Sequence, residues 1–192
     1  MQNLFELSLE EKERWLKDLA DLMGVWEDWR LLATHGERLL PLASQVAHAI
    51  QERLKTNPHT QDTDPVERAL EAIAQVYFNE PTLDAAYLER RAQAGRAYLQ
   101  AGLGPAQLLA GIYGLWVDEW SKAFTQLFPD PGLQARFNRA LALVSLFNAA
   151  VVLTQYAYEA AQAQRLREEE FLRAVGISRE LYQQMAKAAG KA

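Results

Sequence analysis

One stretch of the chain holds the side chains whose types and spacing could do chemistry. Between residues 87 and 108, several residues recur at spacings of three and four, which place them on one face of a helix. They are Tyr87, Arg91, Ala94, Gly95, Tyr98 and Gly102. The phenols and the guanidinium can bind a ligand, and the small residues let a bulky group approach the backbone. This face fits a ligand pocket, and close helix–helix packing is the plainer interpretation that the same spacing allows.

Other chemistries find no support in the sequence. His35, His48 and His59 include no pair four residues apart, the spacing that places two imidazoles on one helix face for a metal. We interpret them as surface or interhelix residues. The chain has no cysteine, which excludes disulfides, zinc–thiolate sites and thiol catalysis. Since no nucleophile–base order or glycine-rich phosphate loop stands out either, we expect no enzyme activity and no metal site.

The elements that must position this face are helices. Ser8 and Glu11 form a capping box before a helix that Gly24 breaks. Further helices are predicted from Gly36 to about Lys55, from the capping residue Asp64 to Pro81, from Thr82 to Gly102, from Gly104-Pro105, and from Asp130-Pro131. The helix after Pro105 carries large apolar residues at helical spacing: Leu109, Ile112, Trp116, Trp120 and Phe124. Because strand signals are almost absent, the predicted fold class is all-α.

The last long helix is apolar nearly all round between Ala140 and Leu153. Both of its faces therefore need burial, and we expect a homodimer through the helices at 115–127 and 137–156. The residues expected to be divided between core and interface are Val144, Phe147, Val151 and Val152. The apolar run is too short for a bilayer, which needs about 20 residues, so no membrane span is predicted.

Charge and composition narrow the partners. The net charge of −5 and the pI near 5.3 lack the basic footprint that nucleic-acid binding requires. The acidic first residues do not form a signal peptide, so a cytoplasmic location is expected. After Gln155 the chain turns charged, with Arg165 to Glu170 as a solvated extension and Gly176 as a break.

The segment from Tyr87 to Pro105 resembles the signal-input domain of globin-coupled sensors, the globin-sensor and protoglobin family. Members carry a tyrosine, an arginine four residues later, a small-residue pair, the haem-ligating histidine three residues after the glycine, and then Gly-Leu-x-Pro. Tyr87, Arg91, Ala94-Gly95, Tyr98 and Gly102-Leu103-Gly104-Pro105 fall into that register. The resemblance extends over most of residues 39–158. It implies a globin-like fold with an extended N-terminal helix (1–35), a globin-sensor domain (36–162) and a C-terminal extension or linker (163–192).

The chain departs from the family at the haem ligand, because Tyr98 stands where the histidine belongs. The family's Phe-Tyr pair in the second globin helix is replaced by Ala49-Ile50. A phenolate can ligate ferric haem, but a tyrosine with a pKa near 10 needs the metal or a cation to ionise. Arg91 lies two helical turns from Tyr98, too far to be expected to help directly.

These departures favour a haem-free signalling globin that acts as a sensing or partner-docking module. The resemblance offers two precedents: the haem-free globin domains of stressosome proteins, and those of sporulation signalling, which are associated with fatty-acid binding. Tyr98 is then expected to point into a former haem pocket that Tyr77, Tyr113 and Trp116 partly fill. A narrow remaining cavity would suit an apolar small ligand. An output domain or another signalling protein is the implied partner. Two alternatives remain: a gas-binding haem protein that uses Tyr98 or a histidine, and a purely structural all-α dimer.

Overall fold

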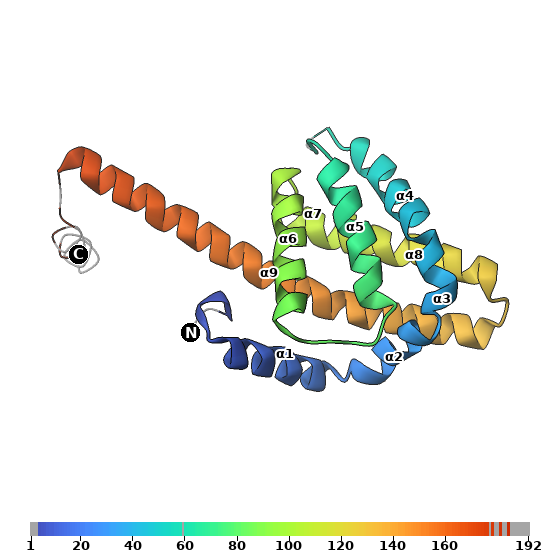
Figure 1. The fold of residues 1–192 in the computed structure, drawn as a ribbon. Coiled ribbons are helices and arrows are strands. Elements are labelled where there is room, and N and C mark those ends of the chain that lie inside the picture. Colours follow the sequence, from blue (N-terminus) through green and yellow to red (C-terminus); the bar gives the residue numbers. More distant parts are fainter. Residues whose placement is uncertain (1–3, 59, 177, 179–180, 182–183, 185–192) are drawn as a thin grey trace, which may run out of the picture. The chain divides into compact units, whose positions relative to one another are not determined.

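The computed structural model describes residues 4–58, 60–176, 178, 181 and 184. His59, one of the three histidines, lies outside these residues. The described residues form helices and no strand (Figure 1), which confirms the all-α class.

The helices follow the predicted order. Their bounds are η1 (Leu4–Glu6), α1 (Leu9–Met23), α2 (Trp26–Thr34), α3 (Gly36–Leu39), η2 (Leu40–Leu42), α4 (Ala43–Lys55), α5 (Asp64–Tyr77), α6 (Ala85–Gln100), α7 (Pro105–Gln107), the π-helix η3 (Leu108–Tyr113), α8 (Gly114–Leu127) and α9 (Pro131–Val175).

Two predicted helix ends are confirmed and one is corrected. Ser8 and Glu11 bond reciprocally at the start of α1, and Gly24 ends that helix with a φ of 64°, in the left-handed region that glycine favours. Asp64, however, is the first residue of α5 and not its cap. Its backbone N–H donates to Oδ1 of Asp62, so the acidic side chain that accepts at this helix start comes two residues earlier.

Helix α6, which carries the candidate face, is capped at both ends by its own sequence. At the start, Asp84 accepts a hydrogen bond from the Tyr87 backbone N–H at 2.8 Å. At the end, the N–H of Leu103 donates to the Tyr98 carbonyl at 3.0 Å and that of Gly102 to Leu99 at 3.0 Å. This pair of bonds is a Schellman motif, and Gly102 supplies the positive φ of 79° that it requires.

The segment after Pro105 differs from the expected uniform helix. Residues 108–113 form a π-helix, in which one turn takes up an extra residue. The register therefore shifts, so Leu108 and Ile112 are buried whereas Leu109 is 42% exposed. The prediction that Leu109 belongs to the apolar face is wrong. Beyond η3, the prediction is confirmed, because Trp116, Trp120 and Phe124 are buried.

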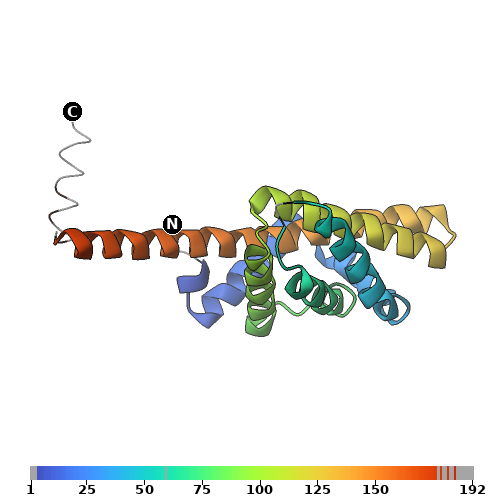
Figure 2. The ribbon, with the colours of Figure 1, turned by 90° about the horizontal axis from the view of Figure 1, so that it is seen from above.

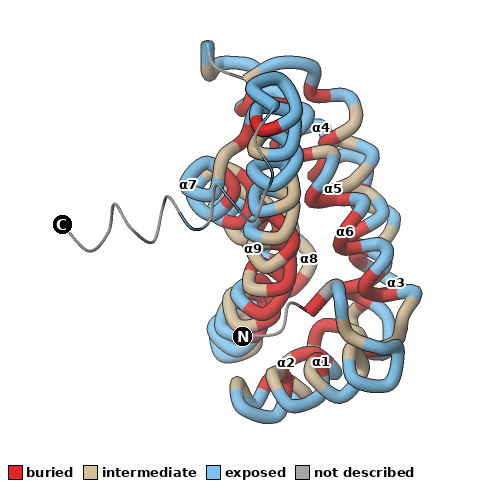
Figure 3. Tube along the Cα trace, turned by 90° about the vertical axis from the view of Figure 1, so that its left-hand side faces the viewer, coloured by how far each residue is buried: buried red, intermediate tan, exposed pale blue. Residues whose placement is uncertain are grey.

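The contact pattern divides the chain into a unit from Met1 to Tyr156 and a unit from Ala157 to Ala192. In the first unit, α4, α5 and α6 lie side by side and run across α8 and the N-terminal part of α9 (Figures 1 and 2). Buried residues line the sides on which these helices face one another (Figure 3). In the second unit, α9 continues to Val175 with mostly exposed residues, and Gly176 follows with a φ of 69°. The predicted break at Gly176 is confirmed.

Residues 1–35 belong to the first unit and are not a separate extension. Leu16 and Trp29 are fully buried, and the Trp29 indole N–H donates to the Val76 carbonyl in α5 at 3.0 Å. The ring of Trp29 also packs edge-on against Phe147 of α9, at 5.6 Å between centroids. The first unit ends at Tyr156, six residues before the expected boundary at 162.

Helix α9 is the one helix in the described part of the chain that is long and apolar enough to cross a membrane by length and composition. The apolar run alone looked too short in the sequence, but the helix around it has 45 residues. In the structure, 61% of its most apolar window is buried inside the protein. The core helix of a protein without any membrane segment passes the same test, so the absence of a membrane span stays a prediction.

We expect the substitution Gly36→Ala to lower the free energy of unfolding by about 1–3 kcal/mol, toward the upper end. A Cβ at Gly36 would overlap the carbonyl oxygen of Phe78, and a backbone atom has little freedom to move away. Urea denaturation followed by circular dichroism measures the change. In the control Gly114→Ala, the new Cβ would lie 3.7 Å from the Leu109 carbonyl, an ordinary contact, so stability should hold or rise. Equal behaviour of the two variants would contradict the proposed close approach.

Candidate functional site

The face of α6 singled out in the sequence is turned into the protein. Tyr87, Arg91, Gly95 and Tyr98 are all buried. Gly102 is exposed, because it lies beyond the end of the helix and serves its C-cap. The prediction of a helix against the core is therefore confirmed for Tyr87 to Gln100, and Gly102 is removed from the candidate pocket.

Gly95 has the packing role that the plainer interpretation gave to the small residues. A Cβ at this position would lie 3.4 Å from Cγ1 of Val152 and 3.6 Å from Cγ of Gln155, both in α9. The absence of a side chain thus lets α6 approach α9 closely. Gly95 shapes the helix contact next to the site and does not itself offer a binding group.

Arg91 is the centre of the candidate site. Its side chain is only 1% exposed. Its guanidinium carbon lies 5.8 Å from the centre of the Tyr87 ring, and its charge bears on the hydroxyls of Tyr77, Tyr87, Tyr98 and Tyr113. From the sequence we expected Arg91 to lie too far from Tyr98 to act on it directly. This prediction is wrong, because the Arg91 charge acts on the Tyr98 hydroxyl. Tyr77 belongs to α5 and Tyr113 to η3, so tyrosines of three elements are within range of this charge.

Two of the four phenols are hydrogen-bonded to polar residues of α9. The Tyr77 hydroxyl lies 3.3 Å from Oγ of Ser145, and the Tyr87 hydroxyl donates to Oδ1 of Asn148 at 3.1 Å. Asn148 in turn donates to the Val144 carbonyl at 2.8 Å. Ser145 and Asn148, which interrupt the apolar run of α9, therefore satisfy buried phenols that would otherwise lose their hydrogen bonds to water.

The other two phenols and the guanidinium have no such partner. The hydroxyls of Tyr98 and Tyr113 and the Nε and Nη1 atoms of Arg91 are buried without a hydrogen bond. Arg91 forms no ion pair with any carboxylate of the described residues. The indole N–H of Trp116, which packs 5.1 Å from the Tyr77 ring, is also unpaired. Native proteins leave few buried polar groups unsatisfied, so this concentration in one place is unusual.

The site keeps its phenols neutral. Burial raises the pKa of Tyr98 and of Tyr77 well above the ordinary value of 10.0, and the Arg91 charge offsets this only in part. Burial likewise raises the pKa of Tyr87 and of Tyr113 above 10.0. At neutral pH these side chains are therefore hydrogen-bond donors and acceptors without a charge, and they do not balance the charge of Arg91.

The residues around Tyr98 do not fit haem. Axial ligation by tyrosine requires the phenolate, and burial raises the pKa of Tyr98, so without a metal this side chain is neutral. Tyr77, Tyr113 and Trp116 are at most 7% exposed, so their rings belong to the core, and their position in a former haem pocket stays a prediction. Dense interiors of this kind resist the repacking that a macrocycle would need.

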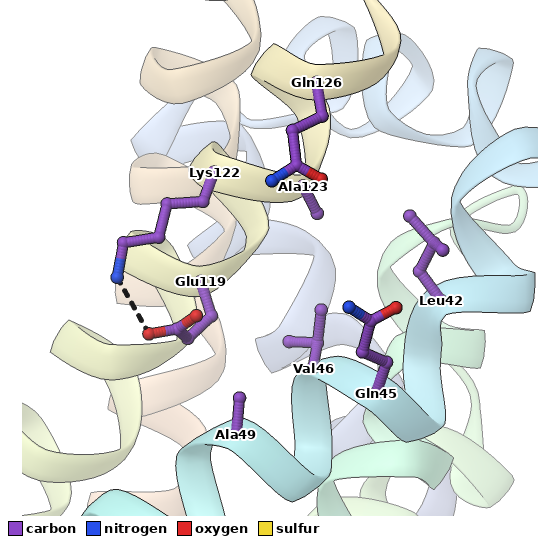
Figure 4. Close-up of a pocket in the computed structure, with 8 residues that line it drawn as sticks. All are labelled: Leu42, Gln45, Val46, Ala49, Glu119, Lys122, Ala123 and Gln126. Atoms are coloured by element: carbon purple, nitrogen blue, oxygen red, sulfur yellow. Dashed lines mark hydrogen bonds and ion pairs between the residues drawn. The ribbon is translucent and has the colours of Figure 1, made fainter.

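The hollow next to Ala49 is too small for haem as well. It lies between α4 and α8 and has a volume of about 140 Å³, below the roughly 300 Å³ at which pockets for small organic ligands begin. Figure 4 shows Val46, Ala49 and Ala123 around the hollow, with Glu119 and Lys122 ion-paired at 2.9 Å along one side. Tyr98 does not line it.

The two described histidines, His35 and His48, contact aromatic rings and a carboxylate, respectively. His35 packs edge-on against the rings of Phe124 and Phe128, at 5.3 and 4.8 Å between centroids, and burial lowers its pKa. His48 is bonded through Nδ1 to Glu67 at 3.1 Å on the surface. Among the described residues no group of three or more His, Cys, Asp or Glu could hold a metal ion.

The four residues expected at a dimer interface are placed elsewhere. Val144, Phe147, Val151 and Val152 are fully buried within the chain's own core. More of the circumference of this helix is buried inside the chain than the sequence predicted, because α2, α5, α6 and α8 all contact it. Among the large apolar side chains in the part of α9 from Pro131 to Tyr156, Leu146 is exposed, at 56%.

The comparisons with known proteins give no relative for this chain. No family model, no curated protein and no solved structure matches it.

The buried phenols make the fold sensitive to alkali. Above pH 10.0, the ordinary phenol pKa, an unfolded chain releases phenol protons that the folded protein retains, so the free energy of unfolding must fall as the pH rises. We expect the part of the tyrosinate absorbance that comes from Tyr77, Tyr87, Tyr98 and Tyr113 to appear only together with the loss of helical circular dichroism. In Tyr98→Phe this dependence should be weaker. Ionisation of all tyrosines with the helices intact would contradict the burial of these hydroxyls.

Proposed function

We propose that the chain is a haem-free signal-input module that resembles the globin-sensor domain and acts by sensing or by docking a partner. The observation that carries the proposal is Tyr98, a neutral, fully buried phenol at the position of the family's haem ligand, in an interior that also buries the rings of Tyr77, Tyr113 and Trp116. A domain that keeps this helix face and closes it to haem fits a sensing role better than gas transport.

The motif in α6 supports the resemblance on physical grounds. Arg91 and Tyr98 share the buried face, Gly95 admits α9 and Gly102 forms the C-cap before Pro105. Each residue of the motif has a role that depends on its type. A random match of about 20 residues would not be expected to place them all in such roles.

The alternative, a gas-binding haem protein, finds less support. The ligand would have to be Tyr98, whose burial disfavours the phenolate, or one of the described histidines. His35 is held between two phenylalanine rings and His48 is bonded to Glu67 at the surface. Neither imidazole faces the interior beside Tyr98.

Addition of hemin to the purified protein tests the function. We expect no Soret band at one-to-one stoichiometry, because the space beside Tyr98 is filled. We also expect Tyr98→His to bind no haem and to have a lower free energy of unfolding than the native chain. Absorbance spectra and urea denaturation measure these two outcomes. Tyr158→His, at a half-exposed position on α9 outside the site, serves as the matched histidine control.

Two results would count against the proposal. A Soret band from the native protein would favour the haem-binding alternative. Ready uptake of haem by Tyr98→His, but not by Tyr158→His, would show an open pocket in which only the ligand was lost.

We further propose that the module is a homodimer and that residues 163–192 connect it to an output domain or a signalling protein. The support for a dimer is the exposed Leu146 of α9, which half-buried apolar residues flank: Ala142, Leu143, Ala150 and Leu153. The support for a connector is the exposed, charged character of Arg165, Glu169 and Glu170.

Leu146→Arg is expected to dissociate the dimer, because the new charge would be buried without a partner. Sedimentation at micromolar concentration measures the change in mass. Since Leu146 is exposed within the single chain, helical circular dichroism should stay as in the native protein. The control is Arg139→Leu, which lies on the same helix near the edge of this face and should not dissociate the dimer. A native protein that sediments as a monomer would exclude the dimer.

A further inference from the structure

We propose that the corner between α2 and α3 is an acid-sensitive joint. The neutral imidazole of His35 holds this corner against the C-terminal end of α8, and protonation of the imidazole releases it. The joint shares no residue with the site around Arg91 and needs no ligand, so it is independent of the haem-free function proposed above.

The contact surface of the joint consists of aromatic rings. His35, the one residue between α2 and α3, packs edge-on against Phe124 and Phe128 at 5.3 and 4.8 Å between centroids. Phe124 in turn stacks on Phe128 at 4.3 Å and on Phe137 of α9 at 3.7 Å. The half-buried imidazole is thus the most exposed member of a cluster whose other three rings are buried.

A second contact of the same corner ends on the same turn of α8. The guanidinium carbon of Arg38 lies 4.1 Å from the centre of the Phe128 ring, and Nη2 of Arg38 donates to the Leu127 carbonyl at 3.2 Å. Arginine keeps its charge at any pH at which histidine titrates. Phe128 therefore already interacts with one cation, and an imidazolium at His35 would bring a second positive charge to the same ring.

No negative charge of the described residues is placed to compensate a proton on His35. Neither His35 nor Arg38 is ion-paired with a carboxylate of this part of the chain. Glu37 of α3 is exposed. Other charged groups on the neighbouring elements have partners of their own, in the pairs Asp28–Arg139, Lys122–Asp118 and Lys122–Glu119 and in the bond from the Gly132 N–H to Asp130.

The pKa of His35 gives the direction of the response. Burial, and to a smaller extent the charge of Arg38, lower the pKa of His35 below its ordinary value of 6.5. A released imidazole in water binds a proton more readily than the packed one, so acid favours release. The stabilising contact is complete above pH 6.5 and is lost as the pH falls from there through the lower pKa of the packed ring.

The opposite side of the corner is held by contacts that do not titrate. Gly36 lies so close to the Phe78 carbonyl oxygen that a Cβ would overlap it, and Leu39 is fully buried. Release is therefore confined to the side chains of His35 and Arg38, which face the end of α8, and does not require the fold to open.

Proton and amide measurements on the full chain test the joint. Nuclear magnetic resonance follows the imidazole of His35, which the loss of its signal in a His35 variant identifies among the three histidines. We expect its midpoint below 6.5. We also expect the amides of Arg38 and Phe128, which bond to the His35 and Phe124 carbonyls, to lose protection against hydrogen exchange in acid. Corrected for the intrinsic exchange rate, opening should increase by up to about tenfold for each pH unit below the ordinary pKa.

Variants separate the joint from general effects of acid. His35→Phe keeps a ring in the cluster and removes the titrating group, so the protection of both amides should no longer depend on pH between about 8 and 5. The matched control, His48→Phe, changes an exposed histidine bonded to Glu67 and should respond like the native chain. Arg38→Met removes the neighbouring cation, so the midpoint of His35 should rise toward 6.5, a shift that a role in packing alone would not produce.

A His35 midpoint at or above 6.5 would overturn the proposal, because the rings would then bind the imidazolium instead of rejecting it. The same loss of protection in His35→Phe as in the native chain would also overturn it, as would simultaneous loss in all helices, which indicates global unfolding. A Soret band with hemin, in contrast, would refute the haem-free function and leave the titration standing. A corner that does not respond to acid would leave that function in place and remove this inference.

Discussion

The uncompensated charge of Arg91 is the constraint on which the interior of this protein depends. A guanidinium that is 1% exposed must be surrounded by groups that tolerate a cation. The chain surrounds it with phenols from three elements: Tyr77 of α5, Tyr87 and Tyr98 of α6, and Tyr113 of η3. Their hydroxyls and ring faces interact favourably with a positive charge, but none of them carries the opposite charge.

The hydrogen bonds divide the four tyrosines around Arg91 into two pairs. On the side that faces α9, Ser145 and Asn148 are the hydrogen-bond partners of Tyr77 and Tyr87, so these two hydroxyls are satisfied. Toward the C-terminal end of α6 and η3, Tyr98 and Tyr113 are unsatisfied. Tyr113 is the last residue of the π-helix, and such π turns are frequent at functional sites because they redirect a side chain at some cost in backbone geometry. One of the two unsatisfied hydroxyls, that of Tyr113, therefore belongs to the π-helix η3.

The sequence allowed much of this arrangement to be predicted, and the failures have physical causes. Ser8, Gly24 and Pro105 act on backbone geometry within a few residues, so their effects on helix ends were readable. The buried face of α6 followed from the spacing of Tyr87, Arg91 and Tyr98. The register after Leu108 was not predictable, because a π turn depends on packing around it and has no local signature.

Tertiary contacts limited the other predictions. The burial of Val144 and Val151 depends on how many helices cover α9, which periodicity along α9 does not reveal. The role of Ser145 and Asn148 could have been suspected, since buried tyrosines need acceptors and these are the two polar residues in the apolar run. The effect of the Arg91 charge on Tyr98 was missed because helical spacing measures the separation of Cα atoms, whereas a buried charge acts over a longer range.

Hydrogen bonds and packing join the C-terminal end of α6 to α9. The Tyr98 carbonyl accepts the Leu103 N–H, and the Leu103 carbonyl accepts the Tyr156 hydroxyl of α9 at 3.1 Å. The C-cap of α6 is thus connected to α9 through two hydrogen bonds. Gly95 brings α6 into contact with Val152 on the same helix. Both contacts lie within the unit that ends at Tyr156, so the position of α6 against this part of α9 depends on Gly95 and on the C-cap that Gly102 forms.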